Sequence, residues 1–208
     1  MPDFVTKKSF FAGFLQFDVK SGDIDSNLSR VEQGLAEIAA SCDQISPGII
    51  VLPELWATGF AYEKLPELAG KTPAILEKLQ ELSAGYKVNI AGSLPEYSYN
   101  PYYNTLFITG TEGIKGSYRK QRLFNPMQED DFFTPGSEPR PIQTDLGSVA
   151  ALVCYDLRFP ELLRELTAFG AHLLVIPAQW PAARLGQWRI LLQARAIENQ
   201  MFVVAANR

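Results

Sequence analysis

The chain has 208 residues, of which 47% are hydrophobic and 20% are charged, and its net charge is −4. This composition is typical of one globular domain with a substantial core, and it excludes a disordered or low-complexity chain. The mild acidity argues against nucleic acid or an anionic membrane as the main partner, because Lys7 and Lys8 alone make too small a basic patch.

A basic pair precedes an apolar stretch near the start of the chain, which is the order found in secretion signals. Gln16 and Asp18 interrupt this stretch, however, and residues 10–17 show the alternating pattern of a strand. No apolar run approaches the roughly 18–20 residues of a membrane-spanning helix. We therefore expect a first strand at 10–17 and a cytoplasmic protein.

The predicted elements alternate between strands and helices. In chain order, the pattern predicts a strand at 10–17, a helix at 27–41, a strand at 48–53, a helix at 72–85, strands at 87–94, 103–110, 113–120 and 148–154, a helix from about 160 to 169, a strand at 172–178, a helix at 186–200 and a strand at 201–207. Residues 121–147, rich in proline and acidic side chains, are expected to form a loop.

The helix at 72–85 has the clearest end signals. Thr72 is the expected N-cap and Pro73 occupies the first helical position, where its missing N–H costs nothing. Gly85 is expected to close the helix.

Three strands lack polar alternation, which is typical of strands that are buried on both faces. Together with the alternating helices, they predict the α/β class. Such sheets bind ligands beyond the carboxyl ends of their strands. The residues at these ends are Glu54, Cys154, Gln179 and Trp180.

Two cysteines, Cys42 and Cys154, fit a reducing compartment without a disulfide framework. Cys42 ends the apolar face of a predicted helix, so we expect it to be unreactive. The single histidine, His172, starts an apolar strand and is expected to be structural. These counts argue against a zinc site and against a Ser-His-Asp triad, and they predict no metal or cofactor.

A cysteine at a strand end is more often a small buried hydrophobic residue than a nucleophile. A nucleophilic Cys154 would need a base and a cation, and without histidine these must be a carboxylate and a lysine or arginine. Glu54 follows a buried strand, Lys120 ends a hairpin arm, and the Tyr155 backbone N–H is a natural donor to an oxyanion. The helix near 160 is expected to favour the thiolate through its dipole.

Three segments resemble the motif blocks of the nitrilase superfamily, the carbon–nitrogen hydrolases. They are "VLPELWATGF" at 51–60, "YRKQRLF" at 118–124 and "LVCYDLRFPEL" at 152–162, in the family's Glu, Lys, Cys order. The resemblance extends from the first strand to the last residue. It implies a single carbon–nitrogen hydrolase domain over residues 1–208, with the fold of a four-layer α-β-β-α sandwich.

The resemblance also implies a catalytic triad of Glu54, Lys120 and Cys154, acting on an amide without a cofactor through a thioester intermediate. Family enzymes often carry a second glutamate between the lysine and the cysteine. Glu129 is the best match, and its implied role is to orient Lys120 or the substrate amide. Asp156 and Arg158 are expected either to shape the pocket wall or to hold the turn after Cys154 by pairing with each other.

The segments "CYDLRFPEL" and "PAQWPAARLGQWRILLQARAIENQ" are most similar to the omega-amidase branch. This similarity implies a small amide with a distal carboxylate, such as 2-oxoglutaramate or succinamate. A carboxylate calls for a fixed arginine, and the candidates are Arg158 and Arg184. Candidate apolar walls are Phe60, Tyr155 and Trp180, whereas Trp188 is expected in the core.

Two alternatives remain open. An N-carbamoyl amino acid amidohydrolase would use the same triad and also need an arginine. A non-catalytic member of the fold would serve as an interaction or sensor protein, since the presence of the triad residues does not prove a working geometry.

Family members usually continue beyond the position of Arg208 with further strands and a tail that packs against a partner subunit. We therefore expect the sandwich to lack its C-terminal strands and tail, which would leave a sheet edge and apolar surface uncovered. A homodimer is expected from the resemblance alone.

Overall fold

The computed structural model describes residues 9–208, so Lys7 and Lys8 and the expectations attached to them lie outside the described residues. The strands form a five-stranded sheet in the order β1-β2-β3-β4-β5 and a four-stranded sheet in the order β6-β7-β8-β9. The first sheet contains β1 (Phe11–Phe14), β2 (Gly48–Val51), β3 (Asn89–Tyr97), β4 (Tyr102–Gly110) and β5 (Gly113–Arg119). The second contains β6 (Ile142–Thr144), β7 (Gly147–Ala151), β8 (Leu173–Pro177) and β9 (Phe202–Ala206).

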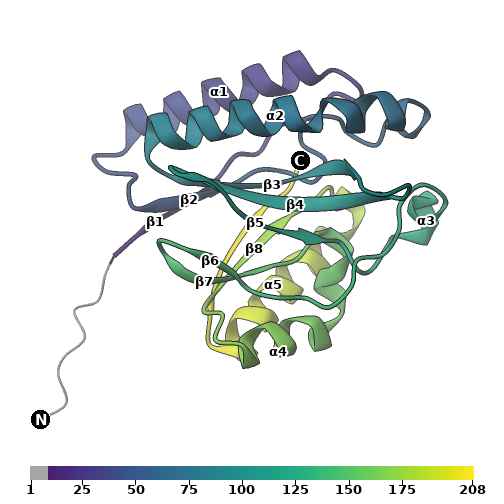
Figure 1. Ribbon diagram of the computed structural model, residues 1–208. Coiled ribbons are helices and arrows are strands. Elements are labelled where there is room, and N and C mark those ends of the chain that lie inside the picture. The colour runs from purple at the N-terminus through teal and green to yellow at the C-terminus, as the bar shows by residue number, and fades with distance from the viewer. Residues whose placement is uncertain (1–8) are drawn as a thin grey trace, which may run out of the picture.

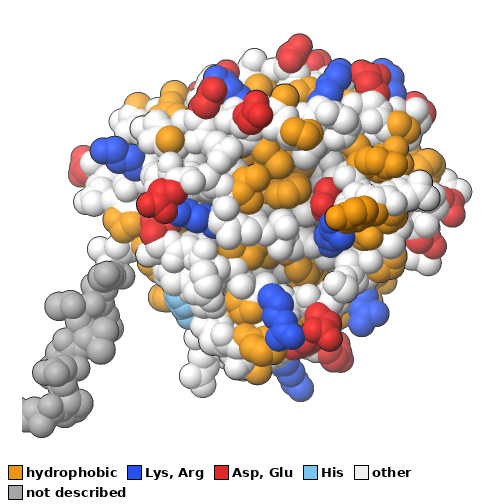
Figure 2. Space-filling model, viewed as in Figure 1, with side chains coloured by type: hydrophobic (Ala, Val, Ile, Leu, Met, Phe, Trp, Pro, Cys, Tyr) orange, Lys and Arg blue, Asp and Glu red, His pale blue; other side chains and the backbone are white. Residues whose placement is uncertain are grey.

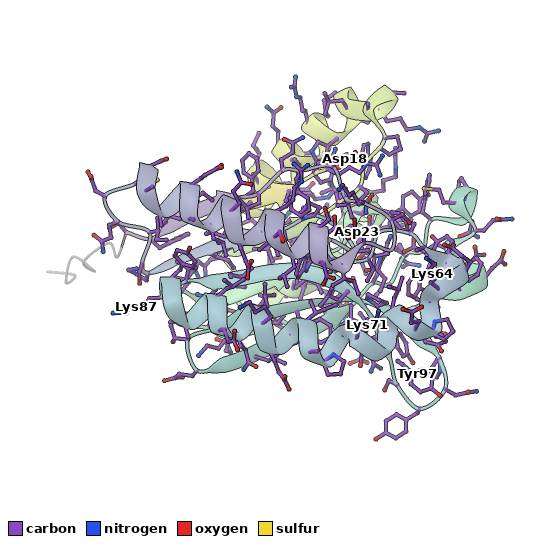
Figure 3. All side chains as sticks on the ribbon, turned by 90° about the horizontal axis from the view of Figure 1, so that it is seen from above. Asp18, Asp23, Lys64, Lys71, Lys87 and Tyr97 are labelled. Carbon is purple, nitrogen blue, oxygen red and sulfur yellow. The ribbon has the colours of Figure 1, made fainter. Side chains whose placement is uncertain are left out.

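The two sheets face each other and helices cover their outer faces, so the predicted four-layer α-β-β-α sandwich is confirmed (Figure 1). The helices over the first sheet are α1 (Ile24–Ser41) and α2 (Leu65–Tyr86). Those over the second are α4 (Pro160–Ala168) and α5 (Leu185–Asn199), and the short α3 (Glu129–Phe132) lies at one end of the sandwich. Seen from above, α1 and α2 lie side by side, with Lys64, Lys71 and Lys87 marking the course of α2 (Figure 3).

The central strands β2 and β8 are buried on both faces, as their apolar sequence predicted, and so is the second half of β7. In the first sheet, β1, β2 and β3 are parallel, and in the second, β7, β8 and β9 are parallel. Ile49 and Val51 of β2 pack in the core between the sheets, whereas Ile50 and Leu52 pack in the core under α1 and α2. This double burial fixes the ends of β2 and its neighbours, where the predicted site residues follow.

The outer face of α1 and α2 is polar, with acidic and basic side chains interspersed (Figure 2). Some of them pair along α2, as Lys71 does with Glu67. At the sheet edges, by contrast, Phe14 of β1 and Phe202 of β9 are exposed, which matches the expectation of uncovered apolar surface there. Among residues 9–208, no helix combines the length and the apolar character that crossing a membrane requires.

The start of α2 differs from the prediction. The helix begins at Leu65, with Pro66 in its first turn, and continues through Pro73. Pro66 fits the rule that proline is tolerated in a first turn, and the helix begins there because Leu65 and Leu68 then extend the buried face. Pro73 lies inside the helix, where it has no N–H for the helical hydrogen bond. Thr72 is therefore not an N-cap; its hydroxyl donates to the Pro95 carbonyl at 2.6 Å.

Other predicted boundaries also shift. The helix α2 ends at Tyr86 rather than Gly85, and Lys87 takes the left-handed conformation of the C-cap, with φ of 55°. The strand predicted at 148–154 ends at Ala151. The predicted loop at 121–147 contains α3 and β6, which were missed because elements of three or four residues carry too little periodicity to detect.

Candidate active site

The residues proposed from the sequence for catalysis and substrate binding lie together in one pocket, with a volume of about 440 Å³ including its open mouth. Its lining includes Glu54, Phe60, Lys120, Glu129, Cys154, Tyr155, Arg158, Trp180 and Arg184. The elements that precede Glu54, Lys120 and Cys154 are β2, β5 and β7, so both sheets contribute to the pocket.

The base of the pocket holds Glu54, which is fully buried. Its Oε1 accepts hydrogen bonds from Lys120 Nζ at 2.7 Å and from Asn104 Nδ2 at 2.9 Å. Its Oε2 accepts from the backbone N–H of Gln179 at 3.2 Å. A buried carboxylate held by donors on both oxygens keeps one orientation and can exchange a proton with a group beside it.

Lys120 follows β5 and joins two carboxylates. Its Nζ lies 2.7 Å from Glu54 Oε1 and 2.8 and 2.7 Å from the two carboxylate oxygens of Glu129. Burial by itself lowers the pKa of Lys120, but the charges of Glu54 and Glu129 outweigh burial and raise that pKa above its ordinary value. The ammonium therefore stays charged at the base of the pocket.

Glu129 begins α3 and is buried beside Lys120. Its Oε2 accepts from the Phe124 N–H at 2.7 Å and its Oε1 accepts from Asn104 Nδ2 at 3.0 Å. The structure thus places the second glutamate of the sequence analysis in direct contact with the predicted lysine.

Asn104 on β4 was missed by the sequence analysis. Its Nδ2 donates to Oε1 of both Glu54 and Glu129, and its backbone carbonyl accepts from the Lys120 N–H at 2.9 Å. The side chain is buried, although the strand around it is otherwise mostly apolar. A polar residue at a buried position of an apolar strand was the one signal in the sequence that pointed to it.

Cys154 begins the 3-10 turn η3 (Cys154–Arg158), in the left-handed conformation with φ of 46°. Burial, followed by the charge of Glu54, raises the pKa of the Cys154 thiol well above its ordinary value, and the charge of Lys120 opposes this shift. The helix α4 begins at Pro160, as the sequence predicted, but burial and the Glu54 charge dominate the pKa of Cys154. A raised pKa favours the protonated form of the Cys154 thiol.

Pairing of Asp156 with Arg158, which was one of two open alternatives, is not found among residues 9–208. Asp156 directs both carboxylate oxygens to the Val153 and Arg122 backbone N–H groups and to the Tyr118 hydroxyl. Arg158 instead lies over the Trp180 ring, 5.0 Å from its centroid. Asp156 therefore holds the turn, as one of the two alternatives predicted, but it does so through backbone N–H groups and not through Arg158.

Aromatic side chains form the pocket walls. Trp180 packs against the buried Trp188 with ring centroids 5.2 Å apart, which confirms the core position predicted for Trp188. The Trp180 Nε1 donates to the Arg184 carbonyl at 3.0 Å, and the Arg184 side chain is exposed at the pocket mouth. Tyr155 packs against Phe124 with centroids 5.0 Å apart.

Tyr62 is a second pocket residue that the sequence analysis missed. Its ring stacks on Phe132 with centroids 4.3 Å apart, and its buried hydroxyl has no hydrogen-bond partner among the described residues. Burial, together with the charges of Glu129 and Glu54, raises the pKa of Tyr62, so the hydroxyl keeps its proton.

His172 has the structural role that was expected, since its Nε2 lies 3.1 Å from the Leu146 carbonyl oxygen at the turn before β7. Within residues 9–208, no group of histidine, cysteine and acidic side chains is arranged to hold a metal ion.

Comparisons with known proteins identify the family of this chain. A family model described as carbon-nitrogen hydrolase matches residues 11–208. A 2-oxoglutaramate amidase of Bacillus subtilis is 39% identical over 196 residues, which cover 93% of this chain and 74% of the relative. An omega-amidase of Homo sapiens is 30% identical over 210 residues, which cover 96% of this chain and 74% of the relative.

Solved structures show the same fold. The crystal structure of an amidase from Nesterenkonia sp. is similar with a TM-score of 0.82 and 27% identity, covering 93% of this chain and 74% of that one. The family match spans nearly all of the described residues, and the relatives are similar in sequence along that whole span. The chain therefore belongs to the carbon–nitrogen hydrolase family, the nitrilase superfamily of amide-hydrolysing enzymes.

Proposed function

We propose that this protein is an omega-amidase, which hydrolyses the carbon–nitrogen bond of a small amide that carries a distal carboxylate. The observation that carries the proposal is the buried Glu54–Lys120–Glu129 network beside the Cys154 thiol, below an arginine that lines the same pocket. The names of the Bacillus subtilis and human relatives support this substrate class.

In the first half of the proposed reaction, Glu54 takes the thiol proton while the Cys154 sulfur attacks the amide carbon. Proton transfer accompanies attack because the raised pKa of Cys154 leaves little thiolate at rest. The carbonyl oxygen becomes an oxyanion, which the Lys120 charge and the Tyr155 backbone N–H stabilise. The carbon–nitrogen bond then breaks as Glu54 returns the proton to the nitrogen, and ammonia leaves a thioester.

In the second half, water enters and Glu54 takes one of its protons as the oxygen attacks the thioester carbon. The carbon–sulfur bond breaks, the carboxylic acid leaves, and Glu54 returns the proton to the Cys154 sulfur. One carboxyl group thus acts first as base and then as acid in each half. Glu129 and Asn104 hold Lys120 and Glu54 in place throughout.

Arg158 is the proposed partner of the distal carboxylate. Its guanidinium lies over Trp180, which fixes its plane, and it lines the pocket that contains Cys154. Arg184 lies at the exposed mouth and is the weaker candidate. A fixed guanidinium binds a carboxylate through two parallel hydrogen bonds, so Arg158 selects for an amide with an anionic tail.

The remaining expectations stay proposals. We propose that residues 1–208 act as one catalytic domain, which the family match over residues 11–208 supports. The free thiols of Cys42 and Cys154 support a reducing compartment such as the cytoplasm. The homodimer stays a prediction, to be tested by light scattering on the purified protein.

Ammonia release from succinamate, 2-oxoglutaramate and N-carbamoyl-β-alanine tests the function, with Cys154→Ala as control. We expect release from the first two amides and none from the Cys154→Ala protein. Release from the carbamoyl compound alone would assign the protein to the N-carbamoyl amino acid amidohydrolases instead. A folded protein that is inactive on all of them would favour the non-catalytic reading.

A further inference from the structure

A third buried carboxylate, beside those of Glu54 and Glu129, lies next to the catalytic network without being part of it. Asp156 is fully buried. Its Oδ1 accepts from the Arg122 backbone N–H at 2.8 Å. Its Oδ2 accepts from the Val153 backbone N–H at 3.0 Å and from the Tyr118 hydroxyl at 2.9 Å. The carboxylate thus binds its own turn through Val153 and the segment around Lys120 through Arg122 and Tyr118, and Asp156 does not line the pocket.

These partners flank two predicted catalytic residues. Tyr118 and Arg122 lie on either side of Lys120, which follows the last strand of the first sheet. Val153 immediately precedes Cys154, which follows β7 of the second sheet. One carboxylate therefore joins the segment that carries the lysine to the turn that carries the cysteine, across the junction of the two sheets.

The turn at Cys154 needs such support. Its φ of 46° is a left-handed conformation that a residue other than glycine adopts only when surrounding contacts enforce it. The Asp156 N–H donates to the Val153 carbonyl at 3.0 Å, and the Val153 N–H donates back to the Asp156 carboxylate. This reciprocal pair closes the turn and holds the thiol at the pocket.

We propose that Asp156 is a positioning residue that sets the Cys154 thiol against the Lys120 ammonium by fastening their two segments together. The inference rests on the proposed function insofar as it assigns these two groups to one reaction. Asp156 itself touches no reacting atom; it acts through the backbone on either side of the groups that do.

The raised pKa of Asp156 distinguishes a role in positioning from a contribution to the stability of the fold. Burial raises the pKa of Asp156 from 3.8 to about 6, although the Lys120 charge and the hydrogen bonds to the carboxylate oppose the shift. Because the pKa is raised in the folded protein, this group favours folding below about pH 4 and loses that contribution as the pH rises through about 6. The ionised carboxylate of Asp156 at neutral pH therefore lowers the stability of the fold. A contribution to stability does not explain its hydrogen bonds.

The charged and titratable groups around Asp156 are few among the described residues. Tyr118 of β5 and Lys120, which follows β5, face Asp156. Cys154 lies in the same turn as Asp156. Arg195 of α5 binds the neighbouring Leu157 carbonyl at 2.9 Å, and β8 contributes only apolar side chains. Protonation of Asp156 near pH 6 removes an acceptor that faces only donors. Activity is therefore expected to fall as the pH drops through about 6, although protonation of this group favours folding.

Asp156→Asn tests the proposal because the amide has the same size but one acceptor oxygen. It can accept from the Arg122 N–H or from the Val153 N–H, and its NH2 group then faces the other donor. We expect kcat for succinamate to fall at least 10-fold, KM to change less than threefold, and the acidic limb of the kcat profile near pH 6 to disappear. The matched control is Asp145→Asn, which changes an exposed aspartate that binds Asn89 away from the pocket.

Tyr118→Phe supplies a second test that does not depend on how well Asp156→Asn folds. The Tyr118 hydroxyl donates to the ionised carboxylate and so lowers the pKa of Asp156; its removal raises that pKa further. We expect the acidic limb of the kcat profile to move to higher pH, whereas Asp145→Asn leaves it in place. An unmoved limb in Tyr118→Phe, or a folded Asp156→Asn with wild-type kcat, would overturn the proposal.

The two proposals fail in different ways. Wild-type protein that releases no ammonia from any amide contradicts the proposed function. Wild-type activity with unchanged variants contradicts only the role of Asp156. Iodoacetamide labelling adds a readout that needs no substrate: the rate at Cys154 relative to Cys42 should drop in Asp156→Asn, and an unchanged ratio would count against positioning.

Discussion

The base and the mouth of the pocket differ in whether their charged side chains are paired. At the base, the Lys120 ammonium is bonded to Glu54 and Glu129, and all of these side chains are buried. At the mouth, Arg158 and Arg184 form no ion pair within residues 9–208. The arginines that do pair in the described chain are Arg119, Arg140, Arg195 and Arg208.

This difference indicates which charges are fixed before a substrate arrives. A buried network of charges that satisfy one another is organised in advance and need not rearrange during a reaction. Arginines without a carboxylate partner keep their hydrogen-bonding capacity for a ligand. The comparison thus assigns chemistry to the base and selection to the mouth, and the following predictions test that division.

The largest effect is expected from Lys120→Met, which removes the cation at the base. The carboxylates of Glu54 and Glu129 then share a buried site without a counter-ion, so the free energy of unfolding should fall by about 3–5 kcal/mol. Ammonia release should fall below detection. Urea unfolding of Lys120→Met and Cys154→Ala separates the two losses, because the cysteine variant should be inactive but nearly as stable as the wild type. Measurable turnover by Lys120→Met would mean that the network is structural.

Asn104→Leu is expected to have the next largest effect, because it removes the donor that Glu54 and Glu129 share. Each Oε1 keeps its bond from Lys120 but loses its second donor. Loss of a hydrogen bond to a charged group costs about 1.5–3 kcal/mol, and we expect kcat to fall roughly 100-fold with little change in KM. Thr105→Val is the matched control, since it removes the bond from the next residue of β4 to Glu96. Equal losses of kcat in both variants would show that β4 matters only as a strand.

Arg158→Gln should act on binding rather than on chemistry. Hydrogen bonds to a charged group contribute about 1.5–3 kcal/mol, so KM for succinamate should rise roughly 10- to 100-fold while kcat changes little. A neutral amide of similar length should show no such rise. Arg184→Gln at the exposed mouth should have the smaller effect, and a larger rise in that variant would reverse the assignment of the two arginines.

Much of the base could be predicted from sequence because the motif segments fix it. Glu54 and Cys154 follow strands whose apolar composition marks them as buried, and Lys120 ends a recognisable hairpin arm. What escaped prediction depends on partners far apart in the chain. Asn104 is separated from Glu54 by 50 residues, and Asp156 from Arg122 by 34. Periodicity describes one segment at a time and does not report such contacts.

The same reasoning applies to the electrostatics of Cys154. The sequence showed a helix after the cysteine, which suggested a field that favours thiolate. It did not show how completely Cys154 is buried, and burial is the largest cause that raises its pKa. Local sequence therefore predicted the identity of the candidate site residues better than their electrostatics.

The smallest effect is expected from Tyr62→Phe, and its sign is informative. Within residues 9–208 the buried Tyr62 hydroxyl has no hydrogen-bond partner, which costs stability of about 1–3 kcal/mol, so the phenylalanine variant should unfold at slightly higher urea concentration. The raised pKa keeps the hydroxyl protonated, so it can donate a hydrogen bond to a bound substrate. We therefore expect kcat/KM to fall a few-fold as stability rises. A gain in stability with no loss of kcat/KM would show that the hydroxyl serves no ligand, and the polar part of the pocket would then end at Lys120 and its carboxylates.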